Sequence, residues 1–189
     1  QAVEYDPSHI SCYMLTYEKG TPLYNSREDG RVQPLAEDNV RTLFETTIDF
    51  LEDHKYFQYE ISNFALPGQE AVHNTNYWRG VTYLGIGPSA HSYDGRSRSW
   101  NIAHNVKYLK ALEADMLPRT IETLTPVDRY NEYVMTSLRT SQGCALAEVT
   151  RLGPEFLDTF LEGIAAPMQA GWLEAHAGHF RLTRAGKLM

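Results

Sequence analysis

The residues best equipped for chemistry fall into two short segments between residues 59 and 95. The first segment, HNTNYW at residues 73–78, contains an imidazole, two amides, a phenol and an indole within six positions. Such a set can hold a planar, carboxylated aromatic ligand by stacking and hydrogen bonding, and its histidine could ligate iron axially. The residues concerned are His73, Asn74, Tyr77 and Trp78. A hydrogen-bonded loop whose rings plug the end of a barrel explains them equally well.

The second segment is LGIGPSA at residues 84–90. Gly85 and Gly87 lack a Cβ, so a flat ligand or another stretch of backbone can approach closely. Tight packing inside a barrel is an equally good explanation. The segment is not a GxGxxG or Walker loop, because it has one glycine pair and a proline where a helix should begin.

Other kinds of catalytic site are not indicated. The sequence has no G-x-S-x-G elbow, no histidine beside either cysteine and no metal-ligand spacing. Glu18 follows a predicted strand and could face a site, although a solvated loop carboxylate is the simpler interpretation.

Composition limits the class of protein. With 189 residues, 42% of them hydrophobic, and a mean hydropathy of −0.43, the chain is expected to be soluble and globular. A net charge of −7 argues against unspecific binding to nucleic acid or an anionic membrane, and no apolar run is long enough to span a bilayer. Two distant cysteines, Cys12 and Cys144, fit a reducing, cytoplasmic environment.

The pattern of the first two thirds predicts alternating strands and helices. His9–Tyr17 and Tyr56–Phe64 are predicted strands, and the apolar spacing of Ala36–Lys55 predicts the helix between them. A strand–helix–strand unit favours a parallel pair with a right-handed crossover. Tyr83–Ala90 is predicted as another short, buried strand.

Asp94-Gly95 predicts a hairpin between residues 89–93 and 96–102. A helix is predicted over Ala103–Met116. Three of its apolar residues are expected to face the core: Val106, Leu109 and Leu112.

Leu117-Pro118 marks a predicted domain boundary, which gives domains 1–118 and 119–189. Arg119–Leu124 is a predicted strand, and Thr125 and Pro126 predict the capped start of a helix. Two helices over 146–152 and 154–170 are then expected, followed by a hairpin over 172–175 and 179–182. The chain stops inside what resembles a new helix, so we expect this domain to be truncated.

Helix, helix and hairpin in this order predict a winged-helix-like domain. From Gly143 onward, however, there are four basic and five acidic residues. A module that reads a DNA groove needs a clustered cationic face, so we expect a structural or docking role and no nucleic-acid partner.

Five ordered segments resemble the oxygen-independent coproporphyrinogen III oxidase family. They are HISCYMLTYEKGTPL at 9–23, YEISNFA at 59–65, HNTNYW at 73–78, YLGIGPSAHSYDG at 83–95 and MTSLRT at 135–140. The HNxxYW element points to the branch regarded as haem chaperones, the HemW-like proteins.

The resemblance implies a radical S-adenosylmethionine protein with a [4Fe-4S] cluster on a CxxxCxxC loop. The implied fold is α/β: the C-terminal half of a partial (β/α)6 barrel, followed by a small helical, winged-helix-like domain. Gly85, Ile86 and Gly87 match the segment close to S-adenosylmethionine, with Ile86 as an apolar contact to its adenine. The motif at residues 73–78 matches the one linked to haem or porphyrin, with His73 as a possible iron ligand.

Three functions follow from the resemblance. The chain could be part of a haem chaperone that passes haem to acceptor proteins. It could be part of an oxidase that converts coproporphyrinogen III propionates to vinyl groups, or an isolated interaction domain without catalysis. As half of a barrel, it is also expected to expose an edge strand and apolar surface, and so to self-associate.

Because the sequence has no CxxxCxxC, we predict that this chain alone performs no radical chemistry. Binding and cleaving S-adenosylmethionine needs three thiolates and an open iron site, whereas the chain has two separated cysteines. Anaerobic reconstitution with iron and sulfide should give no stoichiometric cluster. A cluster whose EPR signal shifts on addition of S-adenosylmethionine would contradict this.

Overall fold

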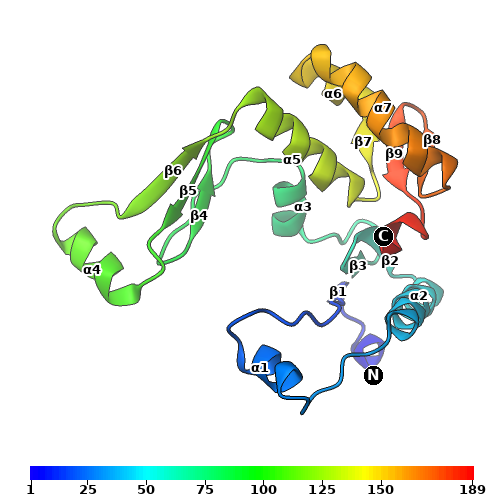
Figure 1. The fold of residues 1–189 in the computed structure, drawn as a ribbon, viewed down its shortest axis with the longest axis horizontal. Coiled ribbons are helices and arrows are strands. Elements are labelled where there is room, and N and C mark those ends of the chain that lie inside the picture. Colours follow the sequence, from blue (N-terminus) through cyan, green and yellow to red (C-terminus); the bar gives the residue numbers. More distant parts are fainter. The chain divides into compact units, whose positions relative to one another are not determined.

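The computed structural model describes residues 1–189, which form a mixed α/β fold divided into two compact units (Figure 1). The first unit is Gln1–Ala71 with Lys187–Met189, and the second is Val72–Gly186. The first holds 13 acidic and 6 basic residues, whereas the second holds 11 of each. The net charge of −7 therefore belongs entirely to the first unit. No helix in the chain is both long and apolar enough to cross a membrane.

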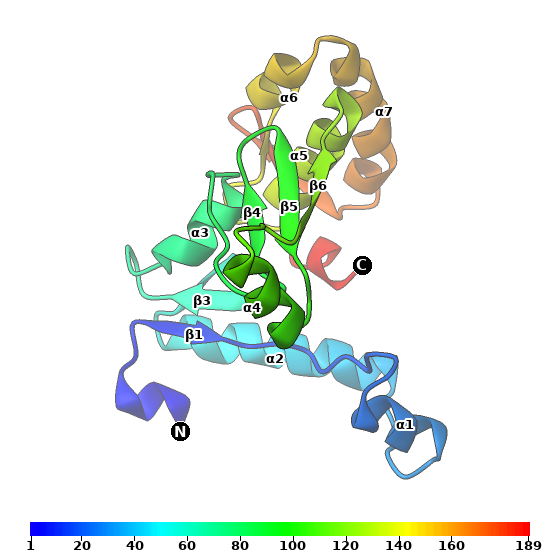
Figure 2. The ribbon, with the colours of Figure 1, turned by 90° about the vertical axis from the view of Figure 1, so that its left-hand side faces the viewer.

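A three-stranded antiparallel sheet packed against one long helix forms the first unit (Figure 2). Its strands run in the order β1-β3-β2. The helix, α2, buries Phe44, Ile48 and Leu51 against Tyr56 and Phe64. The elements of this unit are η1 (Ala2–Tyr5), β1 (His9–Ser11), α1 (Pro22–Glu28), α2 (Glu37–Asp53), β2 (Phe57–Glu60), β3 (Asn63–Ala65) and η2 (Gly186–Leu188).

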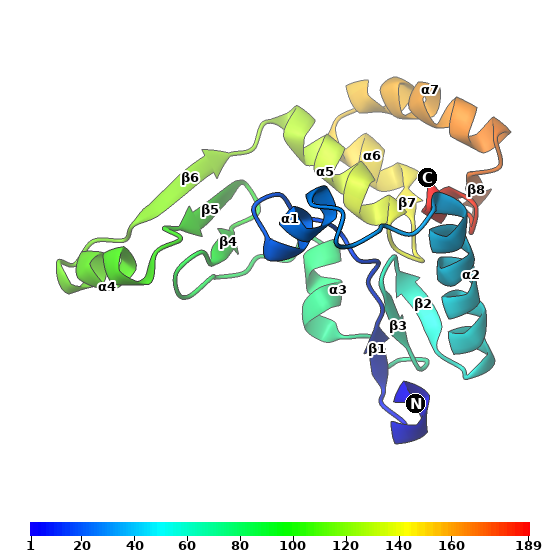
Figure 3. The ribbon, with the colours of Figure 1, turned by 60° about the horizontal axis from the view of Figure 1, so that its bottom comes forward.

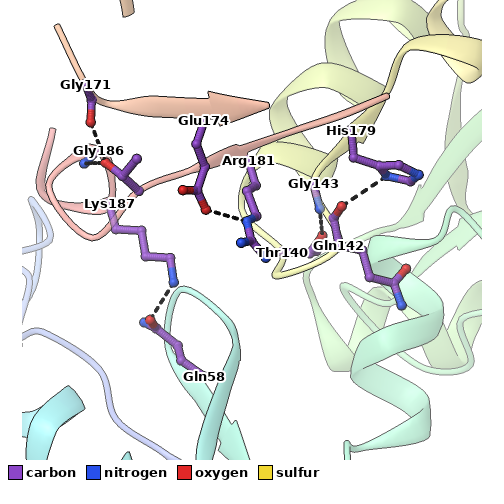
Figure 4. Close-up of polar contacts among 11 residues, drawn as sticks. Gln58, Thr140, Gln142, Gly143, Gly171, Glu174, His179, Arg181, Gly186 and Lys187 are labelled. Carbon is purple, nitrogen blue, oxygen red and sulfur yellow. Dashed lines mark hydrogen bonds and ion pairs between the residues drawn. The ribbon is translucent and has the colours of Figure 1, made fainter. Parts of the chain in front are cut away.

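The end of the chain is fixed to this sheet by a polar contact (Figure 4). Lys187 Nζ donates a hydrogen bond to Gln58 Oε1 at 2.8 Å, and Leu188 packs against the apolar core of the unit.

The predicted helix over Ala36–Lys55 is confirmed, with Ala36 as its N-cap and His54 as its C-cap.

The predicted parallel strand pair is wrong. Residues 56–64 form a hairpin, because the Glu60 carboxylate accepts hydrogen bonds from the Ser62 backbone N–H and the Asn63 amide and so turns the chain. The returning strand β3 lies between β1 and β2 and pairs antiparallel with both. Since β3 offers three residues for pairing, β1 ends at Ser11, and the predicted strand over His9–Tyr17 is too long.

The sequence predicts that residues 12–17 are covered on both sides, but in the structure they are not. Tyr13 and Leu15 are 75% and 69% exposed. They border an apolar groove of about 350 Å³ that also contacts Leu35 and Leu43 of the same unit. An apolar groove of this kind is compatible with self-association, which stays a prediction.

The second unit contains two three-stranded antiparallel sheets, β4-β5-β6 and β7-β9-β8, and five helices. The first sheet runs between α4 and α5 (Figure 1). The elements are α3 (Val72–Trp78), β4 (His91–Tyr93), β5 (Ser97–Asn101), α4 (Asn105–Glu113), β6 (Arg119–Thr123), α5 (Pro126–Leu138), β7 (Cys144–Ala145), α6 (Leu146–Leu152), α7 (Glu155–Gln169), β8 (Leu173–His176) and β9 (His179–Leu182).

The core of this unit lies among α5, α6 and α7, with α6 contacting both of the other helices (Figure 3). Tyr130 stacks on Phe156 with ring centroids 4.6 Å apart, and Phe160 meets Phe180 edge-on at 5.4 Å. The order of helices and hairpin predicted after Gly143 is confirmed. Across the hairpin, Arg181 Nε donates to Glu174 Oε1 at 2.6 Å (Figure 4).

The hairpin predicted around Asp94-Gly95 is confirmed as β4 and β5. The Asp94 carboxylate accepts hydrogen bonds from the backbone N–H groups of Arg96 and Ser97, and these bonds lower the pKa of Asp94. The strand predicted over Tyr83–Ala90 is absent, apart from one bridge between Tyr83 and Tyr93.

The predicted helix over Ala103–Met116 is confirmed in a shorter form, α4, but its apolar face is not buried. Val106, Leu109 and Leu112 are 55%, 58% and 40% exposed, because no other element of the unit covers them. At Leu117-Pro118 the chain passes into β6, which pairs with β5 along five residues. The compact units divide elsewhere, and the boundary between domains 1–118 and 119–189 stays a prediction.

Helix α5 begins at the capping box that the sequence predicts. Thr125 Oγ1 accepts a hydrogen bond from the Asp128 backbone N–H at 3.1 Å, and Asp128 Oδ2 accepts from the Thr125 backbone N–H at 2.9 Å. The Thr125 side chain and backbone both lower the pKa of Asp128, because they bond its charged form.

We predict that this box makes the stability of the chain depend on pH. A carboxylate whose pKa is lowered by folding stabilises the fold above its unfolded pKa of about 3.9, and that stabilisation is lost as the pH falls through the folded pKa. Asp128→Asn should therefore flatten the fall in melting temperature between neutral pH and pH 3.

The control is Glu122→Gln, which removes one exposed negative charge from β6 outside the box. If Asp128→Asn and Glu122→Gln gave the same pH profile, the cap would have no electrostatic role.

Candidate functional site

The HNTNYW segment, expected as irregular chain, forms the helix α3. His73 and Tyr77 lie four residues apart and hence on one helix face. Their ring centroids are 4.9 Å apart at an interplanar angle of 86°. The ring centroids of Tyr77 and Tyr83 are 4.6 Å apart, and those of Tyr83 and Tyr93 are 6.2 Å apart. Four aromatic side chains thus form a continuous row, with the exposed imidazole of His73 at one end.

Trp78 ends α3 and makes a different set of contacts. The guanidinium carbon of Arg139 lies 5.7 Å from the centroid of the indole, a cation–π geometry. The indole Nε1 is buried without a hydrogen-bond partner, and so is Thr75 Oγ1, one turn earlier on the helix. Asn74, the remaining predicted residue, is half-buried on α3.

The C-terminal end of α3 borders a cavity of about 320 Å³ within the second unit. α3 contributes Tyr77 and Trp78, and the loop and hairpin contribute Tyr83 and Tyr93. Helix α5 supplies one complete face at helical spacing, and α6 supplies its last two residues. The α5 and α6 residues are Arg129, Glu132, Tyr133, Thr136, Arg151 and Leu152.

Positive charge dominates this cavity. Four arginines and one carboxylate line it: Arg79, Arg98, Arg129, Arg151 and Glu132. Arg98 Nη1 lies 2.8 Å from Glu132 Oε1, and Arg151 pairs with Glu148, which is not part of the lining. Arg129 Nε is buried and has no hydrogen-bond partner.

Burial shifts three ionisable groups of the lining toward their neutral forms, and it raises the pKa of Tyr133 to about 12. Burial also raises the pKa of Glu132, although Arg98 opposes the shift. It also raises the pKa of Tyr83, with a smaller contribution from Tyr77. The Tyr83 phenol therefore stays protonated at neutral pH and can donate a hydrogen bond.

The glycine segment, residues 84–90, lies in the chain between Tyr83 and Tyr93 of the aromatic row. The backbone groups of its two glycines form hydrogen bonds with side chains. Ser92 Oγ accepts from the Gly85 N–H at 2.9 Å, and Asn101 Nδ2 donates to the Gly87 carbonyl at 2.9 Å. A Cβ on Gly85 would lie 2.1 Å from the His91 carbonyl oxygen, whereas Gly87 needs its glycine for a φ of +107°.

Close packing therefore explains Gly85, and backbone conformation explains Gly87. Ile86, between them, is 85% exposed, which leaves its side chain free to contact a ligand. The roles of these three residues toward S-adenosylmethionine stay predictions.

The cysteines do not fit an iron–sulfur cluster. Cys144 is fully buried in the second unit, and Cys12 belongs to the first. Burial raises the pKa of both thiols, whereas cluster ligands are thiolates. No group of three His, Cys, Asp or Glu side chains has the geometry to hold a metal ion.

The structure thus places Tyr77 and Trp78 in the lining of one cavity, with His73 against Tyr77. Residues 85–87 are not part of that lining, but they closely follow Tyr83, which lines the cavity and contacts Tyr77. Sequence reasoning missed the arginines. A signal was present, because Arg129, Glu132, Tyr133 and Thr136 recur at the spacing of a polar face on the helix whose other face carries Tyr130 and Val134.

This chain matches a protein family, individual relatives and a solved structure. Residues 124–189 match the family described as the HemN C-terminal domain. The whole chain is 28% identical to the haem chaperone HemW of Bacillus subtilis, over 50% of that protein. It is 33% identical to the haem chaperone HemW of Mycobacterium tuberculosis, over 47% of that protein. The chain spans about half the length of the curated relatives it matches.

A solved structure agrees in fold. It is the coproporphyrinogen III oxidase HemN from Escherichia coli, described as a radical SAM enzyme. It superimposes with a TM-score of 0.69 at 19% identity, over 99% of this chain and 47% of that one. Together these matches confirm the resemblance to the oxygen-independent coproporphyrinogen III oxidase family and its HemW-like branch, for the C-terminal portion of such proteins.

We predict that Gly85→Ala destabilises the chain, because the new methyl group meets backbone atoms of His91 that cannot move aside independently. Overpacking of this kind costs about 1–3 kcal/mol of unfolding free energy. Urea denaturation measures it.

Gly163→Ala in α7 is the matched control, since a Cβ there meets nothing within 4 Å. It should leave the stability unchanged or raise it by up to about 1 kcal/mol, because alanine favours a helix. Equal stability of Gly85→Ala and the wild type would contradict the packing role of Gly85.

Proposed function

We propose, from the relation of this chain to the HemW-like branch, that it forms the haem-binding part of a haem chaperone. The observation that carries the proposal is the exposed imidazole of His73, held edge-on against Tyr77 beside an arginine-lined cavity. The name of the relatives that match along the whole of this chain, haem chaperone HemW, supports the choice of ligand.

The chemistry of the site fits haem. A bound haem iron takes an axial imidazole, and His73 is the exposed histidine at one end of the aromatic row. Tyr77 is 45% exposed and offers a ring face or edge for contact with a macrocycle. Because both residues lie on one face of α3, they can approach the same ligand.

An exposed site also suits a carrier. His73 lies at the surface and not in a closed pocket, so a ligand held there can be reached by a second protein. In this proposal α3 orients the imidazole, the tyrosine row shields one side of the ligand, and an acceptor protein approaches from the solvent side.

In the intact protein, we propose that the present elements complete the C-terminal half of a partial (β/α)6 barrel, with a winged-helix-like tail. The [4Fe-4S] cluster would be held outside this chain, and S-adenosylmethionine would lie beside Gly85, Ile86 and Gly87. A cytoplasmic location and the transfer of haem to acceptor proteins belong to the same proposal.

The oxidase alternative is favoured by one observation, the fold shared with HemN at 19% identity. Likeness at that level concerns the fold alone. Conversion of coproporphyrinogen III by the intact protein, in an anaerobic assay with reductant and S-adenosylmethionine, would support the oxidase in place of the chaperone.

We predict that the chain binds haem with a Soret band shifted from that of free haem, and that His73→Ala removes the shift. Loss of the axial ligand should weaken binding at least about tenfold, or roughly 1.4 kcal/mol. Titration followed by absorbance measures both effects.

His176→Ala, which removes an exposed histidine from β8 of the same unit, is the control and should bind as the wild type does. Unchanged affinity and an unchanged Soret band in His73→Ala would show that the assignment of His73 is wrong.

A further inference from the structure

We infer that the cavity bordered by α3, the β4–β5 hairpin, α5 and α6 is a carboxylate subsite, in which Arg129 and Trp78 bind an acid side arm of a planar aromatic ligand. The inference rests on the proposed function for the identity of that ligand as a porphyrin, and it adds the part of the molecule that is recognised. In this arrangement the acid arms of the porphyrin, which are its propionates, enter the cavity while the iron faces His73.

Unpaired hydrogen-bond donors identify the chemistry of the missing group. Three buried side-chain atoms of the chain have no hydrogen-bond partner: Thr75 Oγ1, Trp78 Nε1 and Arg129 Nε. All three belong to α3 or α5, and two of the residues line the cavity. Trp78 Nε1 and Arg129 Nε can only donate. The group that completes them must therefore be an acceptor.

Charge selects an anionic acceptor. The lining has four arginines against one carboxylate, although the unit as a whole has as many acidic as basic residues. Arg98 and Arg151 already have carboxylate partners in Glu132 and Glu148. Arg129 has a buried donor left over, and a guanidinium binds a carboxylate in a planar, charge-assisted geometry.

The walls and the volume favour an arm attached to a flat ring. Aromatic residues from α3, the following loop, β4 and α5 line the cavity: Tyr77, Trp78, Tyr83, Tyr93 and Tyr133. A volume of about 320 Å³ is at the small end of the range of about 300–1,000 Å³ for small-molecule sites. We therefore assign the acid arm to the cavity and the macrocycle to the exposed tyrosine and histidine of α3.

One pair of ligands tests the subsite. The chain is titrated with iron-free protoporphyrin IX, which has two carboxylates, and with its dimethyl ester, which has none, and binding is followed by porphyrin fluorescence. Arg129→Met should weaken binding of the diacid about tenfold or more and leave that of the diester within about twofold, because a charged hydrogen bond is lost only with the acid. Trp78→Phe, which keeps an aromatic ring but removes the N–H, should show the same selectivity to a smaller degree.

Arg96→Met is the matched control. Arg96 lies in the turn of the same hairpin, is exposed and does not line the cavity, so its loss reports the removal of one positive charge alone. It should change neither affinity. If the wild type bound both porphyrins and Arg129→Met weakened binding of the diacid and the diester equally, or of neither, the subsite would not exist. Thermal unfolding checks that each variant is folded, and Trp78→Phe decides the question if Arg129→Met is not.

A probe without a porphyrin separates this inference from the proposed function. In a ¹⁵N NMR titration with benzoate, the Trp78 indole N–H signal, assigned by its absence in Trp78→Phe, should move in the wild type and stay in place in Arg129→Met. Movement without any haem binding would retain the subsite and remove the haem function. Haem binding that depends on His73, with an unmoved indole signal and no effect of Arg129→Met, would retain the function and overturn the subsite.

Discussion

Buried hydrogen-bond donors need acceptors, and the candidate site of this protein depends on that constraint more than on any other. An unsatisfied buried donor costs about 1–3 kcal/mol, so such atoms are rare in folded chains. Here they gather on two helices: Thr75 and Trp78 on α3, and Arg129 on α5. Trp78 and Arg129 line the arginine-rich cavity, and in our proposal a ligand supplies their acceptor.

The rest of the second unit keeps those donors in place. The capping box at Thr125 fixes where α5 begins, and therefore which of its faces carries Arg129 and Glu132. The opposite face packs Tyr130 against Phe156 of α7. Because one side of the helix is held by the core, the side chains on the other side have a defined position around the cavity.

Local signals in the sequence predicted local structure well. Thr125-Pro126 and Asp94-Gly95 determine their own geometry through short-range hydrogen bonds, and both elements have the predicted form. Predictions that depended on distant partners were less successful. His9–Tyr17 has the composition of a buried strand, but β3 provides pairing for three residues only. The apolar face of α4 has the correct spacing, yet no element of the unit covers it.

The same distinction applies to the site. The HNTNYW segment could be identified from the types of its residues, because its aromatic and polar groups are adjacent in sequence. The arginines could not, since Arg79 and Arg129 are separated by fifty positions and meet through the packing of α3, the hairpin and α5. The sequence carries one signal of a lining face, the helical spacing of the polar residues on α5, and no prediction was made from it.

The central claim is that haem binds at α3 and the adjoining cavity. Paramagnetic broadening of ¹⁵N amide signals by ferric haem tests it directly, because the effect falls off steeply with distance from the iron. The account predicts broadening of residues 72–78, with weaker effects near Tyr83, Tyr93 and Arg129. Broadening centred on the apolar groove around Tyr13 and Leu35 of the first unit, or the absence of any broadening, would contradict it.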